Sequence, residues 1–236
     1  MFLKAISRIY EYVTKVKYIS KSKKISHLIK KNLSKDQIFY IIDVGAGARY
    51  LRPVLNFDGS SKIFMIDPND NLNVSVKNLT DIVKFKSNII PIKTGIYKKN
   101  TTLNYYHANI PTSSSFIKYD KELKPQKKKV YNFSTLRKKY KINKIDILKI
   151  DIEGLELEVI KSILKFKNPL IIEIETNFKN SNFGDTFTSI HNFLSKKYNL
   201  ETIFPSYQSS ESNFNSHLKN FKRGTYASPI YRNQVS

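Results

Sequence analysis

Short apolar runs that alternate with helical segments constrain the fold of this chain more than any other feature. The runs occupy residues 38–43, 62–67, 88–92, 146–151 and 170–175. Each is rich in isoleucine and too short for an average helix, which indicates strands. Strands that are apolar along their whole length are typical of parallel sheets, because crossover helices cover both faces of such sheets. We therefore predict a doubly wound, mostly parallel α/β sheet.

The segments that follow these runs complete the pattern. Residues 186–197 fit a helix, and residues 198–204 and 225–235 are predicted to form two late strands. A strand pair after five βα units predicts a seven-stranded Rossmann-like sheet. Another helix should stop at Asn168-Pro169. Its apolar face is formed by Leu155, Val159, Ile160, Ile163 and Leu164.

Two further segments lie between the third and fourth runs. Residues 101–106 alternate between polar and apolar side chains, a pattern that predicts an exposed or edge strand. Residues 121–129 are mostly basic and include Pro125, so we predict an exposed loop there.

The chain is strongly basic, with 41 Lys and Arg against 19 Asp and Glu and a net charge of +22. Such a charge attracts polyanions, whether nucleic acid, an anionic membrane face or an acidic glycan. The simpler interpretation, which we favour, is that most of the lysines are solvated on the surface.

Residues 1–35 carry ten of the basic residues and only one acid, Glu11. Apolar residues recur there at helical spacing, so we predict a basic amphipathic N-terminal helix ahead of one main domain, residues 36–236. We favour packing of this helix on the main fold. The alternative is peripheral contact with an anionic membrane. Its apolar stripe consists of Phe2, Ile6, Ile9, Val13 and Val16.

Several classes of protein are disfavoured by composition. No apolar run approaches the about 20 residues of a membrane-spanning helix. The first residues lack the pattern of a secretory signal. The absence of cysteine excludes disulfides and Cys-based zinc sites, and we expect a cytoplasmic protein.

A glycine turn follows the first predicted strand. Gly45, Ala46 and Gly47 come directly after Asp43 and Val44, in a chain with only seven glycines. Glycines let the backbone turn tightly and approach a ligand, and the next helix directs free N–H groups at the site. Tyr50 replaces the third glycine of a dinucleotide-binding turn, and no P-loop sequence is present.

The second predicted strand ends in an acid, Asp67. A carboxylate at this position lies where it can accept hydrogen bonds from a ribose diol. The alternative is that the segment beginning with Asp67-Pro68 is only a turn. Together, the glycine turn and Asp67 indicate a cofactor that contains adenosine.

The fourth predicted strand ends in a cluster of acids. Asp151 and Glu153 lie two residues apart before Gly154. Two carboxylates at a strand end cost free energy unless they are hydrogen-bonded or used in chemistry. The alternative is that one of them caps the following helix. Glu156 and Glu158 are expected to be ordinary acids of the first helical turn.

These segments resemble the FkbM-type methyltransferases, which are class I enzymes that use S-adenosylmethionine. Residues 145–156 are similar to the family's lDxlKiDvEGxE segment, and the turn after Asp43 is similar to its cofactor loop. Ser113-Ser114-Ser115 matches a serine pair of the family, and Thr135-Leu136 matches a helix before the fourth strand. The chain departs from the pattern at Arg49, where a glycine is usual, and at Arg137, where an acid is common.

The resemblance implies S-adenosyl-L-methionine as the cofactor and transfer of its methyl group to a hydroxyl. The acceptor would be a sugar, a glycan or a small natural product. The residues expected to bind the cofactor are Asp43, Gly45, Ala46, Gly47 and Asp67.

A hydroxyl is a poor nucleophile at neutral pH, so a positioned base would help the reaction. Asp151 is the first candidate and Glu153 the second, although either could instead orient the cofactor or the substrate. Glu175, Ser114 and His107 are candidates for substrate binding, although a lone histidine in a polar loop is more often incidental. No histidine has metal-ligand spacing, so we predict no bound metal.

Two alternatives remain open from the sequence. The first is an RNA adenine N6-methyltransferase, because Asn109-Ile110-Pro111 resembles the loop that grips a flipped adenine. Thr112 stands where an aromatic residue should stack on the base, so we consider nucleic acid a disfavoured substrate. The second is a non-catalytic protein that binds the cofactor or contacts a membrane surface through residues 1–35.

Overall fold

A computed structural model gives the arrangement of most of the main domain. The residues that it describes are 27–28, 38–47, 61–70, 72, 87–107, 114–118, 123–152, 154–177, 186–206 and 226–234. His27 and Leu28 are helical, and the rest of the predicted N-terminal helix lies outside the described residues.

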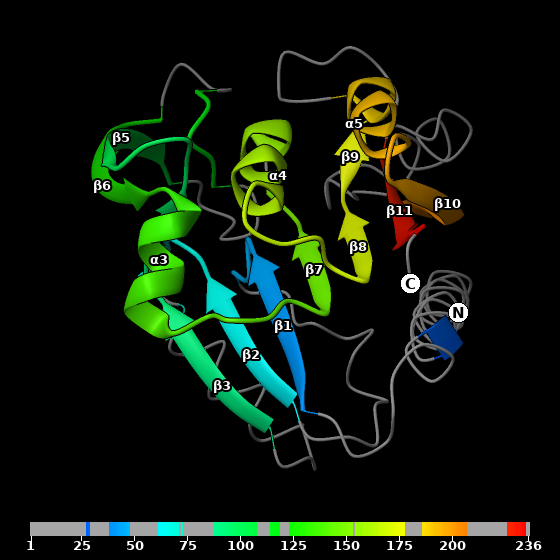
Figure 1. Cartoon of the computed structure of the whole chain (residues 1–236). Coiled ribbons are helices and arrows are strands. Elements are labelled where there is room, and N and C mark those ends of the chain that lie inside the picture. Colours follow the sequence, from blue (N-terminus) through cyan, green and yellow to red (C-terminus); the bar gives the residue numbers. More distant parts are fainter. Residues whose placement is uncertain are drawn as a thin grey trace, which may run out of the picture.

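The centre of the molecule is a large, mostly parallel sheet (Figure 1). The strand order is β10-β11-β8-β7-β1-β2-β3, and the short β9 pairs with β11. All neighbours from β8 to β3 are parallel, whereas β11 is antiparallel to both β8 and β10. The strands are β1 Phe39–Val44, β2 Ser61–Ile66, β3 Ser87–Ile92, β7 Ile147–Ile150, β8 Ile171–Ile174, β9 Thr176–Asn177, β10 Tyr198–Ser206 and β11 Tyr226–Asn233. The predicted Rossmann-like sheet with its closing strand pair is confirmed.

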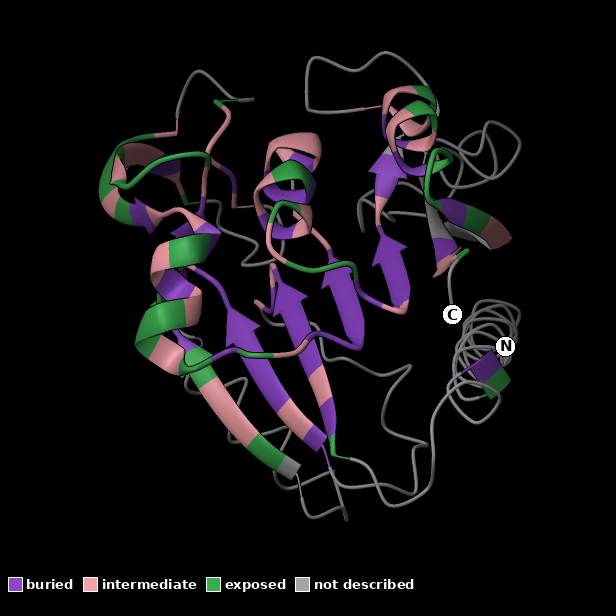
Figure 2. Cartoon of the chain, viewed as in Figure 1, coloured by how far each residue is buried: buried purple, intermediate pink, exposed green. Residues whose placement is uncertain are grey.

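The central strands form where they do because they can bury both of their faces. Every residue of β7 and of β8 is buried, as the continuous purple of the central strands in Figure 2 shows. Successive side chains of a strand point to opposite faces, so Ile41 and Ile42 enter separate cores on the two sides of the sheet.

Three helices cover the face of the sheet that is in front in Figure 1. They are α3 Phe133–Tyr140, α4 Glu156–Leu164 and α5 Phe187–Leu194. Leu136, Ile160 and Ile190 bury their side chains in one core with the strands behind them. The hydroxyl of Thr186 accepts the N–H of Ser189 and caps α5. In the described part of the chain, no helix has the length and apolar character needed to cross a membrane.

A smaller sheet lies beside the main one and contains β4 Gly95–Ile96, β5 Thr101–Tyr106 and β6 Pro125–Tyr131, in the order β4-β6-β5 (Figure 1). The predicted edge strand is confirmed as β5. The predicted loop at 121–129 is wrong for residues 125–129, which form most of β6. Basic side chains indicated exposure correctly, but the backbone of β6 still pairs with β5 and β4 on its two sides.

Candidate active site

The predicted cofactor residues meet at one edge of the main sheet. The strands β1, β2 and β7 are adjacent and parallel, so their carboxyl ends lie side by side. The N–H of Gly45 donates to the carbonyl of Ile66 at the end of β2, at 2.9 Å. The N–H of Asp151 donates to the carbonyl of Val44 at the end of β1, also at 2.9 Å. These bonds bring the glycine turn, Asp67 and Asp151 to the same edge.

Gly45 is the residue that makes this approach possible. Its φ is +80°, in the region that side chains rarely adopt, and a Cβ there would lie 1.9 Å from the carbonyl oxygen of Asp151. Any side chain at position 45 would therefore separate the end of β1 from the segment after β7.

Asp67 is held rigidly against the glycine turn. Its Oδ2 accepts the N–H of Gly47 at 2.8 Å, and its Oδ1 accepts the N–H of Asn69 at 2.7 Å. Burial raises the pKa of this carboxyl, although the two backbone donors oppose that rise. Each carboxylate oxygen can accept more than one hydrogen bond, so Asp67 keeps capacity for hydroxyl donors. The bond to Asn69 shows that Asp67 stabilises the local turn, and its role in binding the cofactor stays a prediction.

A buried charge cluster lies under this edge, centred on Lys149. Its ammonium is 3.2 Å from Oδ1 of Asp43 and 3.0 Å from Oδ2 of Asp151. Glu173 is the neighbour of Lys149 on β8, as Asp43 is on β1. The sequence interpretation missed Lys149 and Glu173. The available signal was one charged residue inside each of two otherwise apolar strands.

The electrostatics of the cluster follow from burial and from these contacts. Burial raises the pKa of Asp43 to about 6, although Lys149 lowers it, and the charges of Asp151 and Glu173 add to the rise. Burial alone would lower the pKa of Lys149, but the three carboxylates raise it overall. Lys149 is therefore a cation at neutral pH, and it binds the strand end of β1 to that of β7.

Asp151 follows β7 directly and is the most open member of the cluster, with 27% of its side chain exposed. Glu153 lies outside the described residues. The N-cap residue of α4 is Leu155, whose side chain makes no capping hydrogen bond, and the helix-cap alternative for Asp151 or Glu153 stays open.

Glu156 and Glu158 lie in the first turn of α4, as predicted. Glu156 has a further role, because its side chain is buried and accepts the N–H of Gly154 at 2.7 Å. That bond stabilises the turn through which the chain enters α4.

The three candidates for substrate binding lie on two sides of the edge. The Nδ1 of His107 is 3.2 Å from Oγ of Ser114, which brings together two of the predicted residues. Backbone bonds between Tyr106 and Ser115 hold this pair of segments together. Glu175 follows β8, and its N–H donates to the carbonyl of Ile150 at the end of β7.

The small sheet is attached to the edge by an ion pair. The ammonium of Lys128 on β6 lies 2.9 Å from both carboxylate oxygens of Asp70, just after β2. The hydrogen bond and charge of Lys128, with the charge of Lys93, hold the pKa of Asp70 below its ordinary value. Within the described ranges, no three His, Asp or Glu side chains are grouped so as to hold a metal. The absence of a metal stays a prediction.

The sheet order, with a glycine turn and strand-end acids at its carboxyl edge, defines the class of Rossmann-like methyltransferases. The family model of the methyltransferase FkbM domain matches residues 34–200. The chain therefore belongs to the FkbM methyltransferase family and is an S-adenosylmethionine-dependent methyltransferase. This membership confirms the expected cofactor and enzyme class and goes against the non-catalytic alternative.

Solved structures of methyltransferases are similar to this chain at low sequence identity and with TM-scores below 0.5. The StiE O-MT, residues 961–1257, is 11% identical with a TM-score of 0.47, over 92% of this chain and 75% of that one. An S-adenosylmethionine-dependent methyltransferase from Clostridium acetobutylicum is 10% identical with a TM-score of 0.45, over 98% and 99% of the two chains. The small RNA methyltransferase HEN1 is 15% identical with a TM-score of 0.43, over 91% of this chain but only 25% of that one. No curated protein matches the sequence.

Proposed function

We propose that the protein methylates a hydroxyl of a sugar, a glycan or a small natural product. The observation that carries this proposal is the meeting of the 45–47 turn, Asp67 and Asp151 at the ends of three adjacent strands. This edge is where open α/β sheets bind their ligands. The choice of a hydroxyl acceptor rests on the resemblance of residues 145–156 to the FkbM segment.

The residues present fit S-adenosylmethionine, which supplies an electrophilic methyl group when it is bound. Asp67, fixed by two backbone donors, would accept hydrogen bonds from the hydroxyls of the ribose. The lack of side chains at Gly45 and Gly47 lets the backbone approach the ligand. Asp43 does not need to touch the cofactor in this proposal, because it is fully buried and anchors the turn through Lys149.

Asp151 is the proposed base for the acceptor hydroxyl, with Glu153 as the second candidate. The ammonium of Lys149, 3.0 Å away, fixes one of the Asp151 oxygens. The ionised form can accept a hydrogen bond from an alcohol and then its proton. Alignment of the two reactants is itself worth several kcal/mol in an in-line displacement.

A methyl-transfer assay tests this function. Purified protein with methyl-labelled cofactor is offered glycans, small alcohols and RNA in separate reactions. We expect label in the glycan or alcohol fractions, and we expect Asp151→Asn to lower kcat by about 100-fold. The affinity for S-adenosylhomocysteine, measured by calorimetry, should change little in this variant. Label in RNA alone would contradict the proposal and support the adenine N6-methyltransferase alternative.

A further inference from the structure

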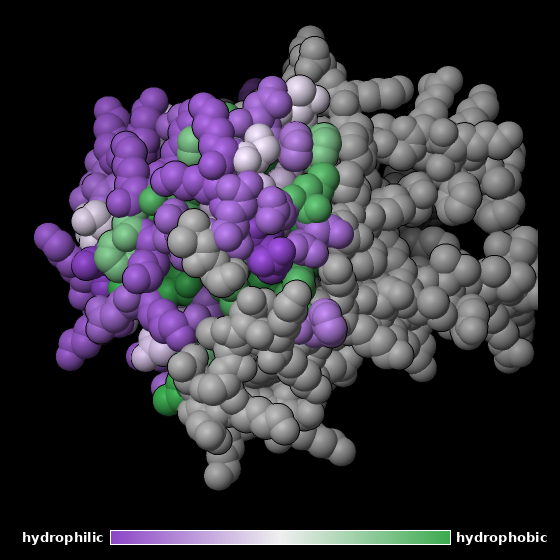
Figure 3. Space-filling view, turned by 45° about the vertical axis from the view of Figure 1, so that its right-hand side comes forward, coloured by the Kyte–Doolittle hydropathy of each residue, from purple (hydrophilic) through white to green (hydrophobic). Residues whose placement is uncertain are grey.

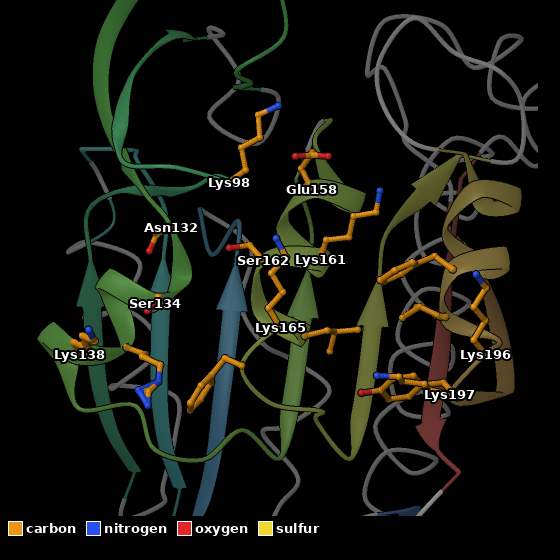
Figure 4. Close-up of a pocket in the computed structure, with 16 residues that line it drawn as sticks. Lys98, Asn132, Ser134, Lys138, Glu158, Lys161, Ser162, Lys165, Lys196 and Lys197 are labelled. Atoms are coloured by element: carbon orange, nitrogen blue, oxygen red, sulfur yellow. The ribbon is translucent and has the colours of Figure 1, made fainter.

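A groove of about 1020 Å³ crosses the outer face of the helical layer (Figure 4). Its walls come from α3, α4 and the end of α5. Hydrophilic side chains cover most of the described surface visible in Figure 3. The groove stands out because nearly all the charged side chains of its lining are positive. Its lysines are Lys98, Lys138, Lys161, Lys165, Lys196 and Lys197.

The positive charge of the groove is not neutralised locally. Arg137 adds a seventh cation, and Glu158 is the one acid in the lining. All six lysines are exposed. Among the residues that the structure describes, no ion pair joins any of the seven cations to a carboxylate. A hollow with this imbalance concentrates anions, and its hollow shape suits a linear polyanion better than a flat membrane.

The aromatic residues of the groove help to choose between two kinds of polyanion. The guanidinium of Arg137 lies 3.8 Å from the centre of the Phe166 ring, and the ammonium of Lys161 lies 5.7 Å from that of Phe193. Both rings thus already carry a cation over one face. Proteins that bind single-stranded nucleic acid present open aromatic faces on which bases stack. The groove offers charge and hydrogen bonds instead, the latter from Asn132 and Ser134.

We propose that this groove binds an acidic glycan, a linear polysaccharide bearing carboxylate or sulfate groups. The proposal rests on the proposed glycan acceptor and names its chemical class. The helix α4 connects the two regions, because it starts just after Asp151 and Gly154 at the site, carries Lys161 in the groove and is followed there by its C-cap residue, Lys165. A chain anchored in the groove would be held next to the reaction edge without any groove lysine touching the reacting atoms.

A matched pair of triple variants tests the groove. The groove variant carries Lys161→Gln, Lys165→Gln and Lys196→Gln. The control variant carries Lys124→Gln, Lys139→Gln and Lys167→Gln, which removes the same charge from exposed lysines outside the lining. The probe is a heparin oligosaccharide titrated by calorimetry. We expect about tenfold weaker binding by the groove variant and less than about a twofold change in the control.

Two further probes separate the alternatives, namely a polyuridylate oligomer of equal charge and vesicles containing phosphatidylserine. An equal loss of heparin binding in both variants would overturn the proposal, since it would indicate diffuse charge. A loss that affects polyuridylate or vesicles but not heparin would also overturn it. The calorimetry measures heparin binding alone and does not depend on methyl transfer. A protein that binds heparin through the groove but methylates neither glycans nor small alcohols would therefore contradict the proposed function and leave the groove assignment standing.

Discussion

Lys149 and the carboxylates around it are the residues on which the geometry of the site depends most directly. Moving a cation and carboxylates out of water costs free energy, and their mutual attraction offsets this cost only when the geometry is good. Here the pairing joins β1 to β7, which places Asp151 beside the glycine turn. The oxygen Oδ2 of Asp43 has no hydrogen-bond partner among the described residues. This unsatisfied atom is consistent with the raised pKa of Asp43.

The raised pKa of Asp43 predicts a pH dependence of stability. The pKa rises from 3.8 to about 6 on folding, so protonation favours the folded state. This contribution is fully present below pH 3.8 and is lost as the pH rises through about 6. For a fully buried group, a shift of about two units corresponds to about 3 kcal/mol.

Denaturant unfolding of the native sequence and of Asp43→Asn, at a series of pH values, measures this effect. The free energy of unfolding of the native sequence, relative to the variant, should fall as the pH rises through this window and stay level above it. A difference that is flat or rises with pH would contradict the assignment.

At Asp67, we expect the substitution Asp67→Asn to weaken binding of S-adenosylhomocysteine by at least about tenfold, because a charged acceptor is replaced by a neutral amide. Calorimetry gives the affinity. Asp70→Asn is the matched control, since Asp70 lies on the same turn but is 78% exposed at the side chain. Equal effects of the two substitutions would show that Asp67 is only a turn residue.

At the scale of elements, α3 depends on its N-cap. The side chain of Asn132 accepts the N–H of Thr135 at 2.8 Å. We expect Asn132→Ala to lower the free energy of unfolding by about 1 kcal/mol, because an N–H of the first turn loses its partner. Chemical denaturation measures the change.

The control for this cap is Ser134→Ala, because Ser134 is exposed and lies in the same turn of α3. Asn132→Asp should retain most of the stability, since aspartate is also a good N-cap residue. A loss in Asn132→Asp as large as that in Asn132→Ala would contradict the capping role.

At the scale of the whole molecule, the charge of +22 includes two separate features, the basic segment 1–35 and the groove. If the N-terminal segment contacts anionic membranes, each lysine near the surface contributes about 1 kcal/mol. The variant Lys15→Gln, Lys17→Gln, Lys21→Gln should then bind phosphatidylserine vesicles about 100-fold more weakly.

Co-sedimentation with vesicles measures this binding. The triple control variant at Lys124, Lys139 and Lys167 carries the same change in charge and should bind nearly as well as the native sequence. An equal loss in both variants would show that the membrane contact reflects net charge and not the N-terminal segment.

Local patterns in the sequence were enough to predict the parallel strands of the main sheet and its closing strand pair. They also predicted that the glycine turn, Asp67 and Asp151 follow the ends of strands. Each of these depends on near neighbours in the chain, through apolar runs or through the backbone freedom of Gly45. The β6 strand was missed because its pairing partner decides its structure, while its basic side chains only report exposure.

The tertiary structure alone decided which charges lie together. Lys149 and Asp43 are 106 positions apart, and only the register of β1 against β7 brings them into contact. The groove likewise gathers lysines from α3, α4 and the segment after α5. No local sequence pattern shows in which order these helices lie on the sheet. Contacts between distant segments depend on strand order and register. For this reason the sequence predicted the cofactor turn, whereas the charge cluster beneath it and the basic groove required the structure.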